Sequence, residues 1–590
     1  MTDILLIQPP VRDFYLTSKR TIPYGLACIS SVLLEEGFSV EIFDGLATSK
    51  SRIIDLPQEM NYLREYYPKP DRSPFGLFHH YRHFGYSFEY IGKIAKDSGA
   101  FLVGISALFT PYVEVALSVA ASVKKFHTEC QIVLGGHHPS SLPISVMEDK
   151  SVDFVLRGEG EVSMPRLARA LKTGTDYASI PGIVFRKDDG TLQLNDPATM
   201  IAPDNFPLPA THLIKQQFYK RGAKGSAVIT ASRGCPMKCT YCAVGASSHV
   251  PYRRRSVTSV VKEIEMTVTR FNAGFIEFED ENLSLDKKWF LHLLDEIKHR
   301  FHGFGLELRA MNGLLPTTLD EALVCAMQAA GFMTLNLSLG SISKAQLRRF
   351  NRPDVREAFD NVLVLAEKYS LNAVGYVIVG APFQSAEDSL SDLIFLAQKR
   401  VLSGVSVFYP APGSKDFELC SRLNILPDKF SLMRSSALPL SHTTTRIETV
   451  TLLRLGRILN FIKLLKDNGV NISDASMNNG RIWNPKDRME TGIKLLQMFL
   501  KDGKIRGITP DGDVFEHRIS SELSKKFIQR LKGIRIRGMN SSSIGTMTIL
   551  AGTNGKWTYR RSVEAEEYVV SSPDSPQILQ FSRFDDEFIP

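Results

Sequence analysis

Short apolar runs alternate with amphipathic stretches along the N-terminal third of the chain. The runs are rich in β-branched residues, and the stretches Gly25 to Glu36 and Val113 to Phe126 carry apolar residues every three to four positions. This alternation is typical of parallel strands connected by helices, so it predicts a doubly wound, Rossmann-like α/β domain over residues 1–175. The predicted strands are Ile4–Ile7, Val40–Phe43, Phe101–Ser106, Gln131–Leu134 and Asp153–Leu156.

Residues 48–95 interrupt this pattern. The segment is rich in Tyr, His, Phe and Pro and has no clean period, so we expect an insertion that acts as a cap or a linker. A further linker is expected over residues 176–222, because it contains a Pro-rich stretch at 203–209.

The alternation of strands and helices restarts after this linker and continues to residue 424. Six βα units of this size predict a partial (β/α)6 barrel over residues 223–424, with its chemistry at the C-terminal ends of the strands. Thr318 with Glu321 predicts one helix start as a capping box, and Ser256 predicts another as an N-cap. The predicted strands are Ala227–Thr230, Phe275–Phe278, Leu306–Arg309, Thr334–Leu339, Ala373–Val379 and Val405–Tyr409.

The pattern changes again in residues 425–590. Two apolar-periodic helices, near 450–465 and 491–500, precede a Ser- and Gly-rich, strand-like tail. We expect a mixed α+β region that caps the barrel mouth and contributes to substrate specificity.

Composition excludes several classes of protein. With 590 residues, 43% of them hydrophobic and 23% charged, the chain is that of a globular protein with several domains. The net charge of +8 (71 basic minus 63 acidic residues) is modest for this length and is not gathered in one run, so no nucleic-acid partner is expected. No apolar stretch approaches the roughly 18 residues of a membrane span. Seven cysteines, an odd number, do not form a secreted disulfide framework and favour the reducing cytoplasm.

Three cysteines carry the strongest chemical signal. Cys235, Cys239 and Cys242 follow the first predicted barrel strand at the spacing C-x3-C-x2-C. Zinc and ferredoxin-type clusters take a fourth ligand, whereas the other cysteines are remote in sequence and lie in apolar contexts. Three thiolates therefore suit a four-iron cluster with one open iron.

This spacing, at the end of the first strand of a six-unit βα segment, resembles the radical S-adenosylmethionine (radical SAM) superfamily. The resemblance implies a [4Fe-4S] cluster whose open iron binds S-adenosylmethionine. Gly340 is a departure, since it stands where the family commonly has Glu before Ser341. The residues that would contact S-adenosylmethionine by this resemblance are Tyr241, Asp280, Glu281, Arg309, Ser341 and Gly380.

Two of these motif regions also have a plainer interpretation. Asp280 and Glu281 are compatible with a solvated strand end. The run Arg253 to Arg255 is more typical of a solvated face before a helix than of a phosphate or substrate contact.

The strand-end loops of the N-terminal domain resemble those of the cobalamin-binding fold. A doubly wound sheet binds ligands at the carboxyl ends of its strands. The loop after the second strand holds Asp44, but Leu46 stands where that fold carries a cobalt-ligating His. The resemblance therefore implies base-off cobalamin whose lower face is bare, water-bound or ligated by another group such as His137 or His138. The residues expected at cobalamin are Pro10, Tyr24, Asp44, Ser106, Leu108, Gly135, Gly136, Gly158 and Glu159.

Over residues 4 to 420 the chain thus resembles the cobalamin-binding radical SAM proteins. That family implies methyl transfer to an unactivated carbon or phosphorus centre of a small molecule, through a 5′-deoxyadenosyl radical and methylcobalamin. It also implies an electron donor such as flavodoxin or ferredoxin.

Two other functions stay open at this stage. One is oxidative cyclisation or rearrangement, as in the anaerobic magnesium-protoporphyrin ester cyclases. The other, from a different class, is a non-catalytic cobalamin-binding sensor or electron-transfer module, which the missing carboxylate at Gly340 keeps in view.

Overall fold

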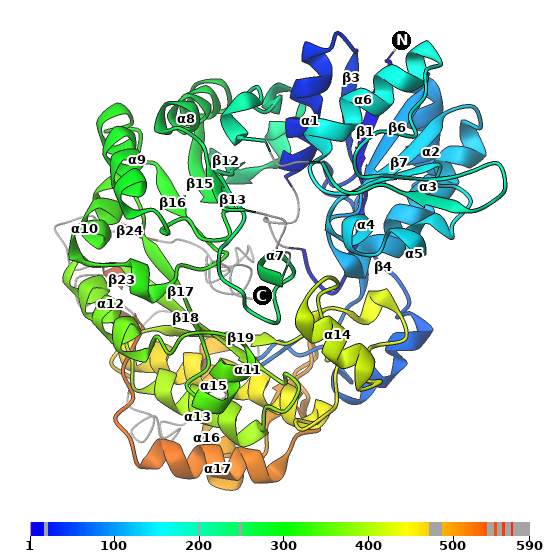
Figure 1. Cartoon of the computed structure of the whole chain (residues 1–590). Coiled ribbons are helices and arrows are strands. Elements are labelled where there is room, and N and C mark those ends of the chain that lie inside the picture. Colours follow the sequence, from blue (N-terminus) through cyan, green and yellow to red (C-terminus); the bar gives the residue numbers. More distant parts are fainter. Residues whose placement is uncertain are drawn as a thin grey trace.

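The structure, a computed structural model, places two α/β units side by side (Figure 1). It describes residues 2–16, 22–198, 201–246, 251–470 and 487–539, and the backbone of strands β22 (Thr548–Ala551), β23 (Trp557–Arg560) and β24 (Tyr568–Val569). No helix in these residues combines the length and apolar character that crossing a bilayer requires.

The N-terminal unit is a seven-stranded sheet in the order β10-β9-β8-β7-β6-β1-β3. All five predicted strands are present and pair in parallel. The chain leaves β1 toward β3 on one side and continues from β6 on the other, so the switch point lies between β1 and β6. The parallel strands are β1 (Ile4–Gln8), β3 (Val40–Asp44), β6 (Leu102–Ser106), β7 (Gln131–Gly135) and β8 (Phe154–Leu156).

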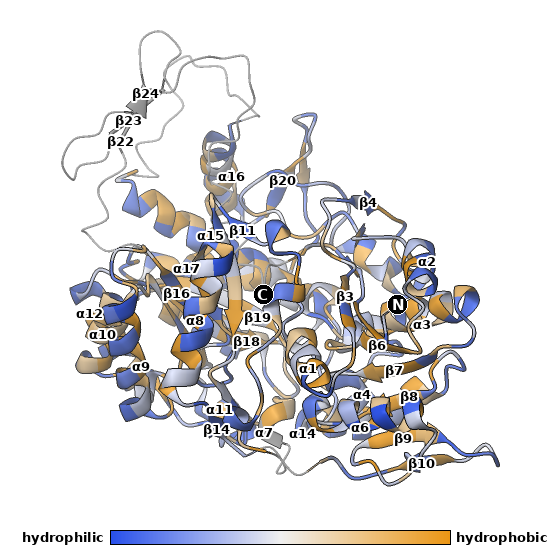
Figure 2. Cartoon of the chain, turned by 90° about the horizontal axis from the view of Figure 1, so that it is seen from above, coloured by the Kyte–Doolittle hydropathy of each residue, from blue (hydrophilic) through white to orange (hydrophobic). Residues whose placement is uncertain are grey.

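Helices cover both faces of this sheet, and its strands are the apolar layer between them (Figure 2). One face packs against α1 (Tyr24–Glu35) and α6 (Gly160–Thr173), and the other against α2 (Phe88–Ser98) and α3 (Val113–Phe126). Short helices α4 (His137–Ser141) and α5 (Pro143–Met147) follow β7.

The linker expected over 176–222 is partly sheet. Strands β9 (Ile183–Arg186) and β10 (Leu192–Leu194) extend the N-terminal sheet as antiparallel edge strands. The pattern did not reveal them because each is only three or four residues long.

The second unit is a curved array of six parallel strands, as predicted. Its two halves, β12-β15-β16 and β17-β18-β19, meet through the parallel bridges Leu308–Phe332 and Leu314–Leu337. The strands are β12 (Lys224–Ile229), β15 (Ala273–Phe278), β16 (Glu307–Arg309), β17 (Thr334–Gly340), β18 (Asn372–Val379) and β19 (Leu402–Val407). A short strand, β11 (Lys220–Arg221), pairs with β12.

Helices surround the outside of the barrel. They are α8 (Val257–Phe271), α9 (Lys287–Arg300), α10 (Glu321–Ala330), α12 (Arg356–Lys368) and α13 (Ala386–Ala397). Two shorter helices, α11 (Lys344–Arg349) and α14 (Lys415–Arg422), follow the carboxyl ends of β17 and β19. Ser256 caps α8 as expected, because its side chain accepts from the backbone N–H of Ser259. The capping box at Thr318 is wrong: Asp320 caps α10, and the Thr318 hydroxyl donates to the carbonyl of Leu315.

The insertion after β3 is part of the core rather than a cap or linker. Met60, Leu63 and Phe75 are fully buried in the same hydrophobic cluster as the barrel and the C-terminal helices. Short strand β5 (Arg82–Phe84) pairs with β2 (Val11–Asp13) on one side and with β4 (Ser51–Ile53) on the other. The segment thereby ties the N-terminal domain to the rest of the chain.

The C-terminal region packs against the last barrel strand. Its long helix α15 (Arg446–Asp467) approaches β19 closely at Gly456, where an added Cβ would lie 2.6 Å from Val405. Helices α16 (Arg488–Asp502) and α17 (Ser521–Lys532) and the hairpin β20 (Arg506–Ile508)–β21 (Val514–Glu516) complete its described part.

Candidate functional site

The three cysteines lie on the loop that leaves the carboxyl end of the first barrel strand. This loop starts after β13 (Ser232–Arg233), which pairs with β14 (Arg253–Arg254). Cys239 is buried, Cys235 and Cys242 are half-buried, and all three are free thiols. The segment 234–242, which we call the cysteine loop, is followed by the short helix α7 (Ala243–Ala246).

The thiols are close enough to affect one another's ionisation. Burial raises the pKa of Cys235, and the neighbouring Cys242 and Cys239 raise it further. In the described residues no three His, Cys, Asp or Glu side chains come together as ligands of one metal ion. Thiolates of a four-iron cluster instead bind different irons, and the cationic cluster relieves their mutual repulsion. The donor set therefore fits such a cluster.

The middle of the cysteine loop is held by two helix ends. Thr240 donates its backbone N–H to the carbonyl of Phe350 (3.0 Å), at the end of α11, and accepts from the backbone of Asp416 (2.9 Å) at α14. Asn351 donates to the carbonyl of Lys238 (2.9 Å). These bonds order the loop without using a thiol.

Asp280 and Glu281, predicted as S-adenosylmethionine contacts, both accept hydrogen bonds from residues 231–234, which lead into the cysteine loop. Asp280 is buried and accepts from the backbone of Ala231 (3.1 Å) and the hydroxyl of Ser232 (2.5 Å). Burial raises its pKa to about 7. Glu281 accepts from the backbone N–H of Gly234 (3.1 Å). The solvated strand end is therefore wrong, and the role of these residues at a cofactor stays a prediction.

Tyr241 is fixed by Arg352, a residue that sequence reasoning missed. The guanidinium donates to the Tyr241 hydroxyl (2.7 Å) and to the Ser338 hydroxyl (2.8 Å). It also covers Gly340, where an added Cβ would lie 3.2 Å from Arg352 Nε and where φ is +81°. The position that lacks the family's carboxylate thus lies beside a cation.

The other predicted S-adenosylmethionine residues have different surroundings. Arg309 is buried at the end of β16. Its positive charge opposes the rise in the pKa of Tyr376 of β18 that burial causes. The Ser341 hydroxyl donates to Asp392 (3.1 Å) and so points toward α13. At Gly380, φ is +77° and an added Cβ would lie 3.1 Å from the Thr449 hydroxyl of α15.

In the N-terminal domain the loops after β6 and β7 approach each other closely. Ala107 donates its backbone N–H to the carbonyl of Gly135 (2.8 Å). Gly136 has φ +123°, and an added Cβ would lie 2.8 Å from the backbone carbonyl of Ala107. Ser106 ends β6, and Leu108 is 45% exposed although it is apolar. The structure therefore brings four predicted cobalamin residues to one sheet edge.

Asp44 reaches the same edge but is occupied by protein partners. It accepts from the Tyr219 hydroxyl and from the backbone N–H of Leu46 (2.9 Å). Burial raises its pKa to about 6. Leu46 is itself buried in a small apolar cluster with Val11 and Tyr112.

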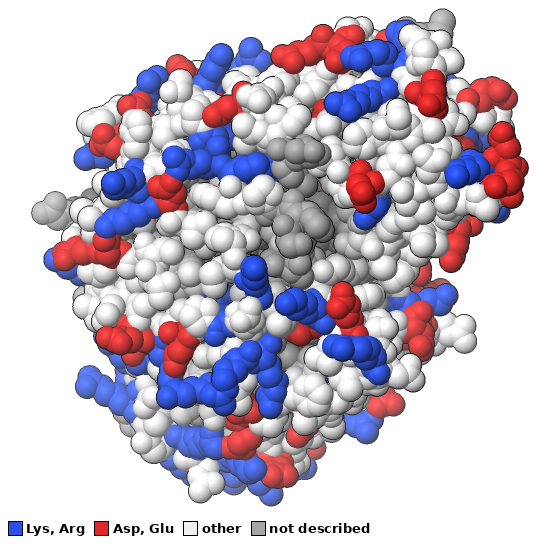
Figure 3. Space-filling view, viewed as in Figure 1, with Lys and Arg blue, Asp and Glu red and all other residues white. Residues whose placement is uncertain are grey.

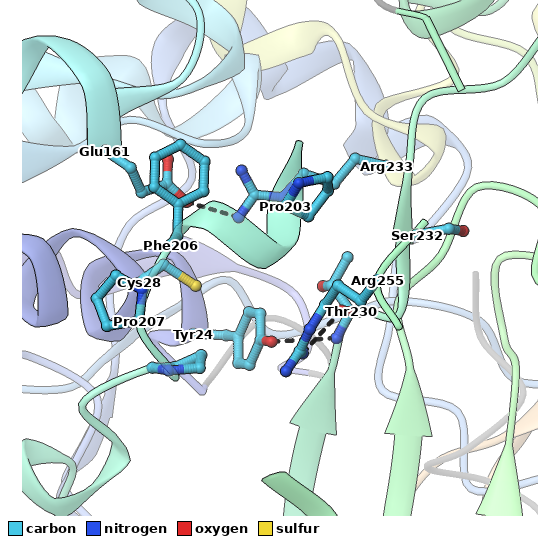
Figure 4. Close-up of a pocket in the computed structure, with 11 residues that line it drawn as sticks. Tyr24, Cys28, Glu161, Pro203, Phe206, Pro207, Thr230, Ser232, Arg233 and Arg255 are labelled. Atoms are coloured by element: carbon cyan, nitrogen blue, oxygen red, sulfur yellow. Dashed lines mark hydrogen bonds and ion pairs between the residues drawn. The ribbon is translucent and has the colours of Figure 1, made fainter. Parts of the chain in front are cut away.

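Tyr24 and Glu159 contact the barrel directly. The Tyr24 hydroxyl accepts from the backbone of Thr230 (3.2 Å), and Glu159 forms ion pairs with Arg233 and Arg253. Figure 4 shows the small cavity between the domains that Tyr24 and Arg233 line. The solvated face expected for Arg253 to Arg255 is thus wrong for Arg253 and also for Arg255, which is buried against Glu263.

Four further residues follow the parallel strands β1, β7 and β8 of this sheet. Pro10 is buried after β1, and Gly158 donates its backbone N–H to the Ser140 hydroxyl (3.0 Å). His138 is buried, with Nδ1 3.3 Å from the Thr110 hydroxyl, and burial lowers its pKa to about 4. His137 is exposed.

Two protein families match the chain. Residues 78–168 match the B12 binding domain, and residues 229–394 match the radical SAM superfamily. The first match covers the strand-end loops at 106–108 and 135–136, and the second covers the cysteine loop.

Methyltransferases are among the similar sequences. An uncharacterized methyltransferase of Pyrococcus horikoshii is 26% identical over 72% of this chain and 84% of its own length. The cytidylyl-2-hydroxyethylphosphonate methyltransferase of Streptomyces wedmorensis is 23% identical over 73% of this chain and 84% of its own. An anaerobic magnesium-protoporphyrin IX monomethyl ester cyclase of Rubrivivax gelatinosus is 26% identical but covers 48% of this chain and 52% of its own length.

Two solved structures share the fold. The radical S-adenosylmethionine methyltransferase TsrM of Kitasatospora setae, solved with cobalamin and a [4Fe-4S] cluster, superimposes with a TM-score of 0.54 at 18% identity over 72% of this chain and 76% of its own. The cobalamin-dependent enzyme OxsB, with aqua-cobalamin and S-adenosylmethionine, gives 0.58 at 15% identity over 85% and 72%. The order of the two domains is therefore that of known proteins.

Proposed function

Since the chain combines a B12 binding domain with a radical SAM domain, we propose that it is a cobalamin-dependent radical SAM methyltransferase. Its substrate in this proposal is a small molecule with an unactivated carbon or phosphorus centre. The two methyltransferases described above match 72% and 73% of this chain, whereas the cyclase relatives match at most 51% of it, which supports methyl transfer over cyclisation.

One observation carries the proposal: the cysteine loop meets the carboxyl edge of the N-terminal sheet. Arg233, two residues before Cys235, donates to Glu159 in the loop after β8 (3.0 Å). A reaction that uses two cofactors requires them to share one site, and this contact brings their expected binding loops together.

The chain's own residues would bind the cofactors as follows. Cys235, Cys239 and Cys242 hold the cluster, and Tyr241 with Arg352 lies beside it to receive S-adenosylmethionine. The backbone of the loops at 106–108 and 135–136 receives cobalamin. When bound, the cluster with S-adenosylmethionine supplies hydrogen-atom abstraction and cobalamin supplies the methyl group.

The lower face of cobalamin has no histidine ligand from the β3 loop in this proposal. Leu46, at the position expected for that His, packs against Val11 and Tyr112. An aliphatic side chain cannot ligate cobalt, which supports a lower face without a ligand from this loop; base-off binding is part of the proposal.

The electron donor in this proposal is an acidic carrier such as flavodoxin or ferredoxin. Lys and Arg side chains gather in the part of the surface in Figure 3 where Figure 1 places α11 and α14. Lys238 of the cysteine loop and Lys344, Arg348 and Arg349 of α11 are all exposed. Complementary charge speeds the encounter of two proteins, so this surface suits an acidic partner.

The seven free thiols also suit the reducing cytoplasm, which we propose as the compartment.

The test is anaerobic reconstitution with iron, sulfide and hydroxocobalamin, followed by reduction and addition of S-adenosylmethionine. We expect about four irons and one cobalt per chain, with both 5′-deoxyadenosine and S-adenosylhomocysteine as products. Deoxyadenosine without S-adenosylhomocysteine would favour cyclisation, and a wild-type chain that binds no cluster would refute the proposal.

A further inference from the structure

A half-buried ion-pair network joins the N-terminal domain to the base of the cysteine loop. Glu159 Oε1 accepts from Arg233 (3.0 Å) and from Arg253 (2.7 Å), and Oε2 accepts from Arg253 (3.0 Å). The Glu159 side chain is 11% exposed, so water screens these contacts little.

The two arginines belong to the two strands that close the cysteine loop. Arg233 of β13 pairs with Arg253 of β14 in the antiparallel ladder. One carboxylate of the N-terminal domain therefore holds both the strand that leads into the loop and the strand that leaves it. Arg253 also donates to the carbonyl of Ile201 (2.6 Å), which fixes its orientation.

The position of Glu159 at the start of α6 predicts a different role, that of a helix cap. It occupies the N-cap position of α6, yet its side chain makes no capping hydrogen bond. The carboxylate turns instead to the arginines, and Glu161 in the first turn adds a second contact to Arg233 (2.5 Å). Acidic groups are favourable at a helix N-terminus, so α6 contributes to both contacts.

A second contact lies on the other side of the small cavity shown in Figure 4. The Tyr24 hydroxyl donates to Glu263 (3.4 Å), and Glu263 pairs with Arg255. Cys28 of α1 is 6% exposed and lines the same cavity of about 30 Å³. Its thiol therefore reports on whether the two domains stay closed at this point.

We propose that Glu159 is a positioning residue that clamps the cysteine loop against the carboxyl edge of the N-terminal sheet. This inference rests on the proposed function, in which the clamp keeps the two cofactor sites at a fixed separation. A displacement of about 1 Å between reacting groups is enough to slow a reaction on the order of 100-fold, so a rigid link between the two domains has a direct use.

The first test is alkylation of the reconstituted holoenzyme with iodoacetamide under anaerobic conditions, followed by mass spectrometry of each cysteine peptide. Glu159→Gln keeps the shape of the side chain but removes its charge. We expect the modification rate of Cys28 to rise about tenfold, whereas Cys130, in the core of the N-terminal domain, is unchanged. Asp153→Asn, which breaks the ion pair with Lys124 inside the N-terminal domain, is the matched control and leaves Cys28 as in the wild type.

The second test separates positioning from general damage. With reduced cobalamin and S-adenosylmethionine, we expect Glu159→Gln to form S-adenosylhomocysteine at least tenfold more slowly, while 5′-deoxyadenosine formation stays within about threefold. Arg233→Lys keeps the charge and is expected to retain part of the Cys28 protection. If Glu159→Gln does not fold, Glu159→Asp keeps the charge but shortens the side chain, which pulls the carboxylate away from the arginines, and it is measured in its place.

Two results would overturn the clamp: Cys28 modification within twofold of the wild type, or equal slowing of both products. Failure of the proposed function is distinguishable, because a wild type that forms neither product still shows whether Cys28 becomes accessible on loss of Glu159.

Discussion

The carboxyl edges of the two parallel sheets differ in what their side chains hold. In the barrel, Asp280 and Glu281 bond to the start of their own domain's cysteine segment. In the N-terminal domain, Asp44 accepts from Tyr219 of the linker, and Glu159 reaches across to Arg233 of the barrel domain. In both domains the parallel strands end at one edge of the sheet, and the polar groups lie there. What each polar group binds depends on the part of the chain that packs against that edge.

The sharpest test of the barrel edge is Cys235→Ala. The loss of one of three thiolates leaves the cluster with too few ligands, so iron falls from about four per chain to near zero and S-adenosylmethionine is not cleaved. Iron analysis and 5′-deoxyadenosine assays measure this. Cys325→Ala, at an exposed cysteine of α10, keeps both values; a cluster retained in Cys235→Ala would contradict the assignment.

The matching test of the N-terminal edge is Gly136→Ala. The new Cβ meets the Ala107 backbone in a conformation with positive φ, so we expect about 2–6 kcal/mol of destabilisation and loss of bound cobalt. Urea unfolding and cobalt analysis measure the two effects. Gly25→Ala has open space around its Cβ and serves as the control; normal cobalt binding in Gly136→Ala would show that the two loops do not form the cobalamin site.

The contact between Asp44 and the linker is broken by Tyr219→Phe. Removal of the hydroxyl leaves a buried carboxylate oxygen without its partner, at a cost of about 1–3 kcal/mol. Because the Tyr219 hydrogen bond lowers the pKa of Asp44, its loss also moves that pKa upward from about 6. Urea unfolding at pH 7 measures the cost; an unchanged midpoint would mean that this contact contributes nothing to stability.

The most gradual effect is a pH dependence at Asp392, the partner of the barrel residue Ser341. Burial raises the pKa of Asp392 from 3.8 to about 8, so the folded state holds a proton that the unfolded state releases. Stability from this group is complete below about pH 4 and is lost as the pH rises to about 8, by at most about 1.4 kcal/mol per pH unit. Asp392→Asn lacks this titration, so the difference between its unfolding free energy and that of the wild type follows this slope. A difference independent of pH would show that Asp392 is ionised when folded.

Much of the fold follows from the sequence, because a buried parallel strand needs a continuous apolar run whatever packs on it. All eleven predicted strands and the helix cap at Ser256 are confirmed. The edge strands β9 and β10 and the buried insertion were missed, since short strands and aperiodic aromatic segments carry no pattern of their own.

The candidate site divides in the same way. The cysteine loop was visible because three thiols at fixed spacing are rare, and the glycines at 135–136 because their turns recur in a known fold. Arg352 and the clamp of Arg233, Arg253 and Glu159 were not visible, since their partners are up to 111 residues apart in the chain.

The sequence alone therefore shows two successive α/β domains, a loop with three thiolates after the first barrel strand, and Leu46 at the position where a His is expected. Those features depend on local order and residue chemistry. Only the tertiary structure shows that Glu159 binds Arg233 of the barrel domain. It also shows that Asp280 accepts hydrogen bonds from Ala231 and Ser232, just before the cysteine loop, rather than facing water. The same carboxylate binds a cation, accepts from a backbone or meets solvent according to the surface that folding brings against it.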